Sequence, residues 1–201
     1  MKPIRLLLYL IMMCLSLSVL AQSKGQLAFT SSSPNANKLL RSAWVDLADF
    51  RIPEGNNTLQ QLLKEDPDCG MAYASLFTLS NEERQENLRK AKSLKLSTDE
   101  KMLLEGIMAR LDSRSTQEFF APLMKKYPSD DYLHLVIMFN SAPDAALQIG
   151  ETIIKKKTKL APAHNMLGYL YMARDEMAKA EAHFDKYIAL RPDLANPYDS
   201  K

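Results

Sequence analysis

The stretch APAHNMLGYLYMARDEMAKAEAHFDKYIALRPDL, residues 161–194, decides the fold expected for this chain. Its apolar residues recur between 166 and 171 at three- and four-residue steps, which is the period of one face of an α-helix. A polar turn near Arg174 separates this helix from a second stripe of the same period at 180–188. Pro192 then ends the second helix, because proline disfavours helical geometry in the residue before it. The stretch predicts two short amphipathic helices packed as a hairpin.

Gly168 lies inside the first of these helices, where a glycine costs about 1 kcal/mol relative to alanine. This cost is reasonable if a second helix has to come close at that point. Ala180 is the small residue expected opposite Gly168, and Phe184 would fill the space beside both. The hairpin is therefore predicted to close on a glycine, an alanine and a phenylalanine.

These residues resemble the tetratricopeptide repeat (TPR), an antiparallel helix pair of about 34 residues. The positions that follow the order and spacing of the family are His164, Leu167, Gly168, Tyr171, Ala180, Phe184 and Pro192. His164 stands where the family has tryptophan, and Tyr187 is large where the family usually has a small residue. The resemblance implies an all-α fold, a right-handed superhelical solenoid of antiparallel helix pairs.

Weaker copies of the same pattern precede the hairpin. Apolar residues stand four or five positions before Pro67, Pro128 and Pro192, and the gaps between these prolines are 61 and 64 residues, each about two repeats. Ser97 and Glu100 have the spacing of a capping box, which marks a helix start midway through the first gap. We expect about five helix pairs over 38–194, with the start of a further truncated or frayed helix at 195–201.

The chain begins with the pattern of a secretory signal peptide over residues 1–21. Lys2 and Arg5 precede an apolar core, and small residues precede a cleavage site after Ala21. An uncleaved membrane anchor is the alternative. Lipidation at Cys14 is not expected, because Met13 stands where a lipid-attachment site has a small residue. The serine-rich residues 22–37 show no helical period and are predicted to be a flexible or extended lead-in.

Charge and cysteine content narrow the class of protein further. Without 1–21 the chain keeps 24 of its 26 Lys and Arg residues against 24 Asp and Glu, so the mature protein has no basic surplus for binding nucleic acid. Cys69 is then the one remaining cysteine, which excludes an internal disulfide. Stability must come from helix packing.

No motif for catalysis, cofactor binding or metal binding is evident. His134, His164 and His183 are far apart and none belongs to an HExxH motif. The six glycines are isolated, so no phosphate-binding loop is predicted. Lysines at 155–157 and 159 close a predicted helix, where cations suit the helix dipole. Weak contact of these lysines with an acidic partner or with membrane headgroups is the alternative.

The remaining candidate site is the concave face that stacked hairpins form with the first helix of each pair. In the clearest repeat, Asn165, Tyr169 and Met172 point away from the apolar stripe, so we expect them to line a partner-binding groove. Packing against the neighbouring repeat is the alternative for Tyr169 and Met172. An amide, a phenol and a thioether suit a peptide backbone with apolar side chains.

We therefore predict a non-catalytic interaction or scaffold module, exported to the periplasm or the cell exterior, that binds a protein or peptide. Two alternatives stay open. The chain could be the recognition arm of an enzyme whose catalytic part follows residue 201, or a structural subunit of an envelope assembly.

Overall fold

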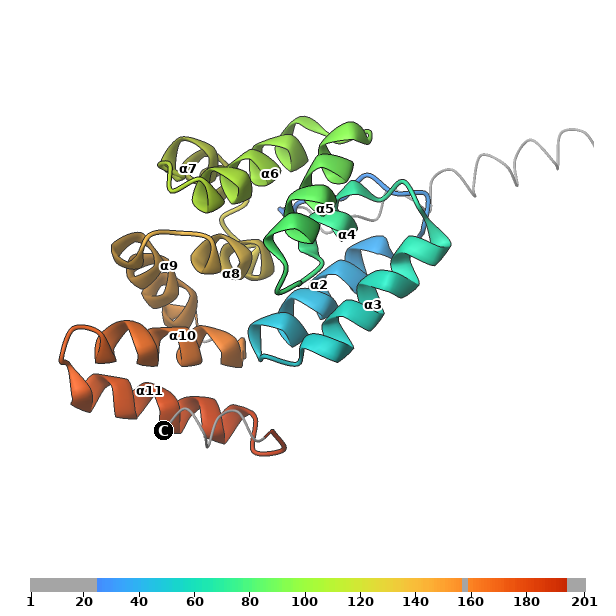
Figure 1. The fold of residues 1–201 in the computed structure, drawn as a ribbon. Coiled ribbons are helices and arrows are strands. Elements are labelled where there is room, and N and C mark those ends of the chain that lie inside the picture. The colour runs from blue at the N-terminus through green and yellow to red at the C-terminus, as the bar shows by residue number, and fades with distance from the viewer. Residues whose placement is uncertain (1–24, 157–158, 195–201) are drawn as a thin grey trace, which may run out of the picture.

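The computed structural model describes residues 25–156 and 159–194 (Figure 1). In these two stretches the chain is helical and irregular, without a strand. The helices are α2 (Ala36–Ala48), α3 (Ile52–Glu65), α4 (Gly70–Ser75), α5 (Asn81–Ser93), α6 (Thr98–Leu111), α7 (Gln117–Lys126), α8 (Asp131–Phe139), α9 (Pro143–Lys155), α10 (Ala161–Met172) and α11 (Met177–Leu190).

Consecutive helices pack as five antiparallel pairs within the described part of the chain, from α2 with α3 to α10 with α11. This confirms the predicted all-α superhelical stack. Helices α3, α7 and α11 each end two residues before the prolines that were expected to stop them. The capping box at Ser97 and Glu100 is also present, at the start of α6.

The expected close approach at Gly168 is present in the last pair. A Cβ atom on Gly168 would lie 2.3 Å from a ring carbon of Phe184, so only glycine lets α10 and α11 come this near. The same contact recurs two repeats earlier, where a Cβ on Gly106 would lie 2.2 Å from the ring of Phe120. The repeat is therefore visible in packing even where its sequence pattern has faded.

Helix α4 is the shortest of the described helices. It ends at Ser75, and Leu76 after it has a non-helical backbone. Phe77 consequently leaves the helix and stands exposed in the connection to α5. This shortening matters for the candidate site below.

Residues 25–33, which we call the strap, belong to the segment that was predicted to be a flexible or extended lead-in, and they have no helix. The strap crosses the turns that join successive pairs, and three carboxylates hold its backbone N–H groups. Asp130 accepts from Leu27 at 2.8 Å, Glu100 from Thr30 at 2.8 Å, and Asp66 from Ser32 at 2.7 Å. Leu27 and Phe29 are buried in the core. The strap has no helical period in its sequence, but it is held in place by hydrogen bonds to side chains far along the chain.

The carboxylates that hold the strap also cap their own turns. Asp66 accepts from Asp68, Glu100 from Ser97, and Asp130 from Leu133, each through a backbone N–H. Burial opposes ionisation of Asp66, but hydrogen bonds from the strap outweigh it and hold the pKa of this carboxyl below its usual value. Each acidic residue therefore joins one inter-pair turn to the strap.

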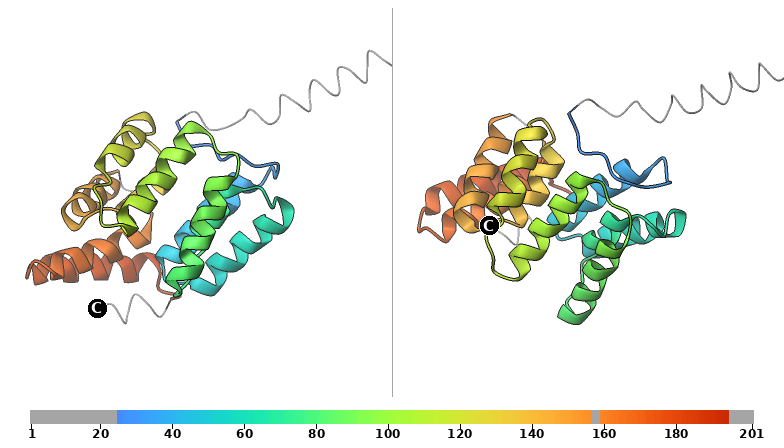
Figure 2. Two further views of the ribbon diagram at one scale, coloured as in Figure 1. Left: turned by 45° about the horizontal axis from the view of Figure 1, so that its top comes forward. Right: turned by 90° about the horizontal axis from the view of Figure 1, so that it is seen from above.

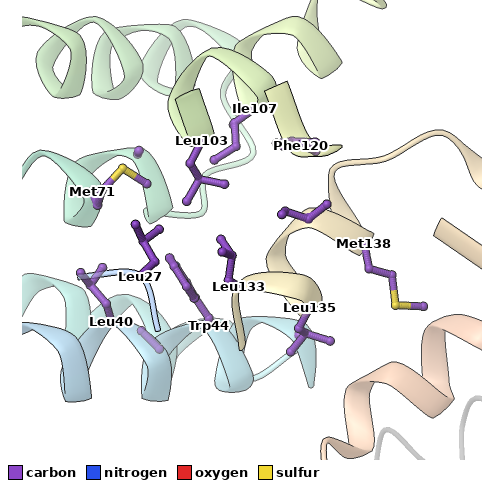
Figure 3. Close-up of a cluster of buried hydrophobic side chains, with 14 of the residues drawn as sticks. Leu27, Leu40, Trp44, Met71, Leu103, Ile107, Phe120, Leu133, Leu135 and Met138 are labelled. Atoms are coloured by element: carbon purple, nitrogen blue, oxygen red, sulfur yellow. The ribbon is translucent and has the colours of Figure 1, made fainter. Parts of the chain in front are cut away.

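The inner side of the superhelix is filled rather than open. Helix α2 of the first pair lies against α8 of the fourth pair, in addition to its own partner α3. Leu27 of the strap, Trp44 of α2, and Leu133 and Leu135 of α8 converge between them (Figure 3). Figure 2 shows the first two pairs beside the stack of later pairs. The expected concave groove is thus occupied by core side chains.

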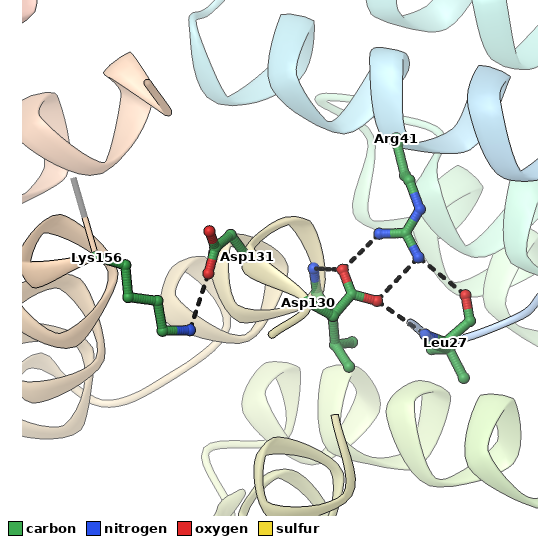
Figure 4. A network of polar contacts seen from close by, with 6 residues as sticks. Leu27, Arg41, Asp130, Asp131 and Lys156 are labelled. Atoms are coloured by element: carbon green, nitrogen blue, oxygen red, sulfur yellow. Dashed lines mark hydrogen bonds and ion pairs between the residues drawn. The ribbon is translucent and has the colours of Figure 1, made fainter. Parts of the chain in front are cut away.

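Asp130 lies at the centre of this closure (Figure 4). Its side chain is fully buried and accepts hydrogen bonds from both terminal nitrogens of Arg41, at 2.5 and 2.8 Å. The same Arg41 nitrogen that lies 2.8 Å from Asp130 also donates to the carbonyl of Leu27 at 2.9 Å. One buried ion pair therefore joins the strap, α2 and α8.

A second buried carboxylate joins the first pair to the last. Asp49, directly after α2, accepts from the hydroxyl of Tyr187 at 3.0 Å and pairs with Arg191 at the end of α11. Burial raises the pKa of Asp49 to about 6, although Arg191 and Tyr187 act in the opposite direction. The first and last pairs are thus linked by polar contacts.

Two predictions concern residues outside those that the structure describes, namely the signal peptide at 1–21 and the further helix at 195–201. Among residues 25–156 and 159–194, no helix has the length and apolar character needed to cross a membrane.

We predict that Asp130→Asn lowers the free energy of unfolding by about 3 kcal/mol or more, because removing one partner of a buried ion pair typically costs about 3–5 kcal/mol. Asp131→Asn is the matched control. Its carboxylate pairs with Lys156 at 2.9 Å where both side chains are partly exposed, so a loss of at most about 1 kcal/mol is expected. Urea denaturation of both variants measures the difference. Equal losses would contradict the central role of Asp130.

Candidate functional site

An apolar pocket of about 440 Å³ opens at the carboxyl ends of α2, α4, α6 and α8. We call it the end pocket. The strap bonds near the amino ends of α4, α6 and α8, so the two features lie at opposite ends of these helices. The buried and half-buried residues of its lining, which we call the floor, include Trp44, Ala74, Ile107, Leu135, Val136 and Phe139. This size is within the range of protein sites that bind a small molecule or a few side chains.

The polar groups in the floor of the pocket are already paired with protein atoms. The indole N–H of Trp44 donates to the hydroxyl of Ser75 at 2.8 Å, and that hydroxyl donates to the carbonyl of Met71 at 2.7 Å. The side-chain amide of Asn140 donates to the carbonyl of Val136 at 2.8 Å. The floor therefore offers mainly apolar contact.

Phe50 stands at the rim with a strained backbone. Its φ is 60°, in the left-handed region that a bulky residue rarely adopts, and 58% of its surface is exposed. The corresponding turns of the third and fifth pairs also have a left-handed residue, but there it is Ser113 and Asp175. Aspartate tolerates this conformation well. The first pair thus keeps a large apolar side chain in water at a position where a small polar one would serve.

Phe77 also lines the pocket, and its backbone is held by hydrogen bonds. Asn56 donates to the carbonyl of Phe77 at 2.8 Å and accepts from its N–H at 3.0 Å. Leu111, at the end of α6, also lines the pocket and is exposed, and Leu79, close to Phe77 in the sequence, is 93% exposed. Exposed apolar side chains gathered around one opening indicate an interaction surface.

Arg84 of α5 is the one charged side chain among the described residues that line the end pocket. One of its terminal nitrogens donates to the carbonyls of Ala74 and Leu76, at 3.3 and 2.9 Å. These carbonyls end α4, so the guanidinium caps that helix. Burial lowers the pKa of Arg84, but an arginine keeps its charge in proteins. The pocket therefore combines apolar walls with one fixed cation.

Among the described residues that line the end pocket there is no His, Cys, Asp or Glu. Elsewhere, the part of the chain that the structure describes includes no cluster of three His, Cys, Asp or Glu side chains that could hold a metal ion. Cys69 is buried, and burial raises the pKa of its thiol, which disfavours the reactive thiolate.

The three residues predicted to line a groove do not form one surface. Asn165 is 1% exposed, so the expectation that it faces a partner is wrong. Helix α10 packs against α11 on one side and against α8 and α9 on the other, which buries position 165 as well as the predicted stripe. Tyr169 and Met172 are exposed, and Tyr169 contacts Phe184 edge to face. Their role in binding stays a prediction.

The histidines are partly brought together by the fold. The Nδ1 atoms of His164 and His183 lie 3.0 Å apart, and His183 stacks on Tyr171 with ring centroids 5.4 Å apart. Burial, with the charges of His183 and Lys186, lowers the pKa of His164 to about 4, so this ring is neutral near pH 7. One of these two Nδ1 nitrogens donates a hydrogen bond to the other. His134 lies apart from them in α8 and is buried.

Phe50 and Phe77 at the pocket rim were not among the residues predicted to bind a partner. The available signal was the comparison of equivalent turns. The clearest hairpin turns at Asp175, whereas the first hairpin has Phe50 at the equivalent position. A phenylalanine in a polar turn is a candidate contact residue on sequence grounds.

Among the known proteins compared with this chain, similar ones were found in the solved structures alone. No family model matches the chain, and no curated protein matches it. One similar structure is YrrB, described as a TPR protein with an unusual peptide-binding site, with 14% identity over 81% of this chain and 89% of that chain, and a TM-score of 0.44. Another is PilW, described as a widely conserved type IV pilus biogenesis factor, with 18% identity over 84% and 82% and a TM-score of 0.47. Similarities of this size do not identify a function.

We predict that Phe50→Asn leaves the free energy of unfolding unchanged or raises it by up to about 1 kcal/mol, because asparagine tolerates the left-handed conformation. Phe184→Ala is the contrasting variant. Phe184 is buried against Gly168, and its truncation is expected to cost about 3–5 kcal/mol. Chemical denaturation measures both. A clear loss of stability in Phe50→Asn would show that Phe50 serves the fold rather than a contact surface.

Proposed function

We propose that this chain is a non-catalytic binding module that receives an apolar segment of a protein partner in the end pocket. The observation that carries the proposal is the strained and exposed Phe50 at the mouth of an apolar pocket. A turn that keeps a large apolar side chain in water, at a cost in backbone strain, is explained when that side chain contacts something else.

The form of the opening favours a protein segment. Phe50, Phe77 and Leu111 line the pocket and are exposed, so they add apolar surface at its mouth. A small-molecule site usually buries most of its ligand, whereas a protein contact combines a deep anchor pocket with a wider apolar margin. The floor of the pocket can take the anchor, and the exposed rim can cover its neighbours.

Export to the bacterial envelope or beyond is part of the proposal, and the pattern of residues 1–21 supports it. The absence of a basic surplus after removal of this segment also suits a protein partner better than a nucleic acid.

Photo-crosslinking in the native host tests the proposal. The residue p-benzoylphenylalanine replaces Phe77 at the pocket rim, where it keeps an aromatic ring in the same exposed place. We expect a discrete protein adduct, found in the envelope or secreted fraction. Glu86 on the exposed side of α5 is the matched control position and is expected to give no adduct.

Two outcomes would overturn the proposed site. An adduct from position 86 as strong as that from position 77 would indicate nonspecific contact. An adduct from Tyr169 of α10 together with none from Phe77 would favour the surface predicted from the sequence, and would place the partner on the last helix pair instead.

A further inference from the structure

We propose that the partner segment carries an acidic side chain beside its apolar anchor, and that Arg84 in the wall of the end pocket binds this carboxylate. This inference rests on the proposed function and specifies the chemistry of the partner. It concerns a side-chain carboxylate within a protein segment, in contrast to a free chain end or a small amphiphile.

The charge balance of the pocket is the first argument. Arg84 is the one charged residue among those described that line it, and no carboxylate in the same described stretches lies within ion-pair distance of its guanidinium. Nearby Glu83 accepts from the hydroxyl of Thr78 and from no arginine in the described part of the chain. A partly buried cation among apolar walls is complemented by an anion from the partner.

The geometry of Arg84 is the second argument. The carbonyls of Ala74 and Leu76 both receive their hydrogen bonds from the same terminal nitrogen, Nη1. This leaves the edge of the guanidinium formed by Nε and Nη2 without a protein acceptor among the described residues. That edge has the shape that binds both oxygens of a carboxylate. Because α4 already fixes the group, little side-chain freedom is lost on binding.

The carboxyl ends of the helices around the pocket repel an anion, and this repulsion opposes the attraction by Arg84. The carboxyl ends of α2, α6 and α8 carry partial negative charge, but this effect is weak and fades within one helical turn. A two-point bond between arginine and carboxylate in a partly dry site is stronger than such a dipole contact. The carboxyl end of α4 is itself neutralised by Arg84. The balance favours an acidic group directly at Arg84.

A peptide-display experiment tests this chemistry. Random nine-residue peptides, displayed with their carboxyl ends fused to phage coat protein, are selected on the full mature chain. The fusion removes free chain-end carboxylates, so acidic side chains alone are sampled. We expect selected peptides to contain Asp or Glu within two positions of Phe, Trp, Leu or Ile, and a glutamine in place of that acid to weaken binding about tenfold.

Two pocket variants and one control distinguish the effect of the Arg84 charge on binding from its effect on the stability of α4. Arg84→Met removes the cation and also a helix cap. Asn81→Asp keeps the cap and places a repelling carboxylate among the pocket-lining residues, at the first position of α5, where an acidic residue suits the helix. Peptides selected on either variant are expected to keep their apolar anchors but to show no enrichment of Asp or Glu. Arg89→Met, on the exposed side of α5, is expected to select the same peptides as the wild type.

The outcomes distinguish this inference from the proposed function. Selected peptides with apolar anchors but no acidic preference would overturn the role of Arg84 and leave the binding pocket intact. An acidic preference that survives in Asn81→Asp and Arg84→Met would likewise overturn it. If no peptide is enriched, the proposed function fails, and binding of decanoate to the wild-type chain in that case would point to a small anionic amphiphile.

Discussion

The buried ion pair between Arg41 and Asp130 is the constraint on which the rest of the structure depends. A row of helix pairs makes contacts mainly between neighbours and leaves its inner face open. Here Asp130 begins the fourth pair, Arg41 belongs to the first, and both hold Leu27 of the strap. A fully buried carboxylate is stable only when its oxygens are satisfied. The guanidinium of Arg41 and the backbone N–H groups of Leu27 and Leu133 together satisfy them. The superhelix is therefore closed on itself.

This closure decides where a partner can bind. Because the strap and α2 fill the inner side, the surface that such a solenoid would usually offer is part of the core. One apolar surface that remains uncovered lies at the end where α2, α4, α6 and α8 finish, and the short α4 leaves Phe77 outside. The same compaction that stabilises the chain thus produces a pocket in place of a groove. Arg84 gives the described lining of this pocket its one charge.

The helical hairpins could be predicted from the sequence because their causes are local. All of these causes depend on residues within one repeat: the spacing of the apolar residues on a helix face, the capping at Ser97, and the close contact of Gly168 with Phe184. The strap and the closure could not be predicted in this way, since Leu27 meets Asp130 across 103 residues. The burial of Asn165 was missed for a similar reason. A helix inside a stack is covered on two sides, whereas the period of one hairpin reveals only one of them.

Hydrogen exchange of the strap amides tests the central claim most directly. If Asp130, Glu100 and Asp66 hold the strap as described, the N–H groups of Leu27, Thr30 and Ser32 exchange as slowly as the amides inside α2 and α8. Their protection is also lost only when the whole domain unfolds. Rapid exchange of all three amides in the native protein would contradict the account, because the strap would then not be held across the inner face.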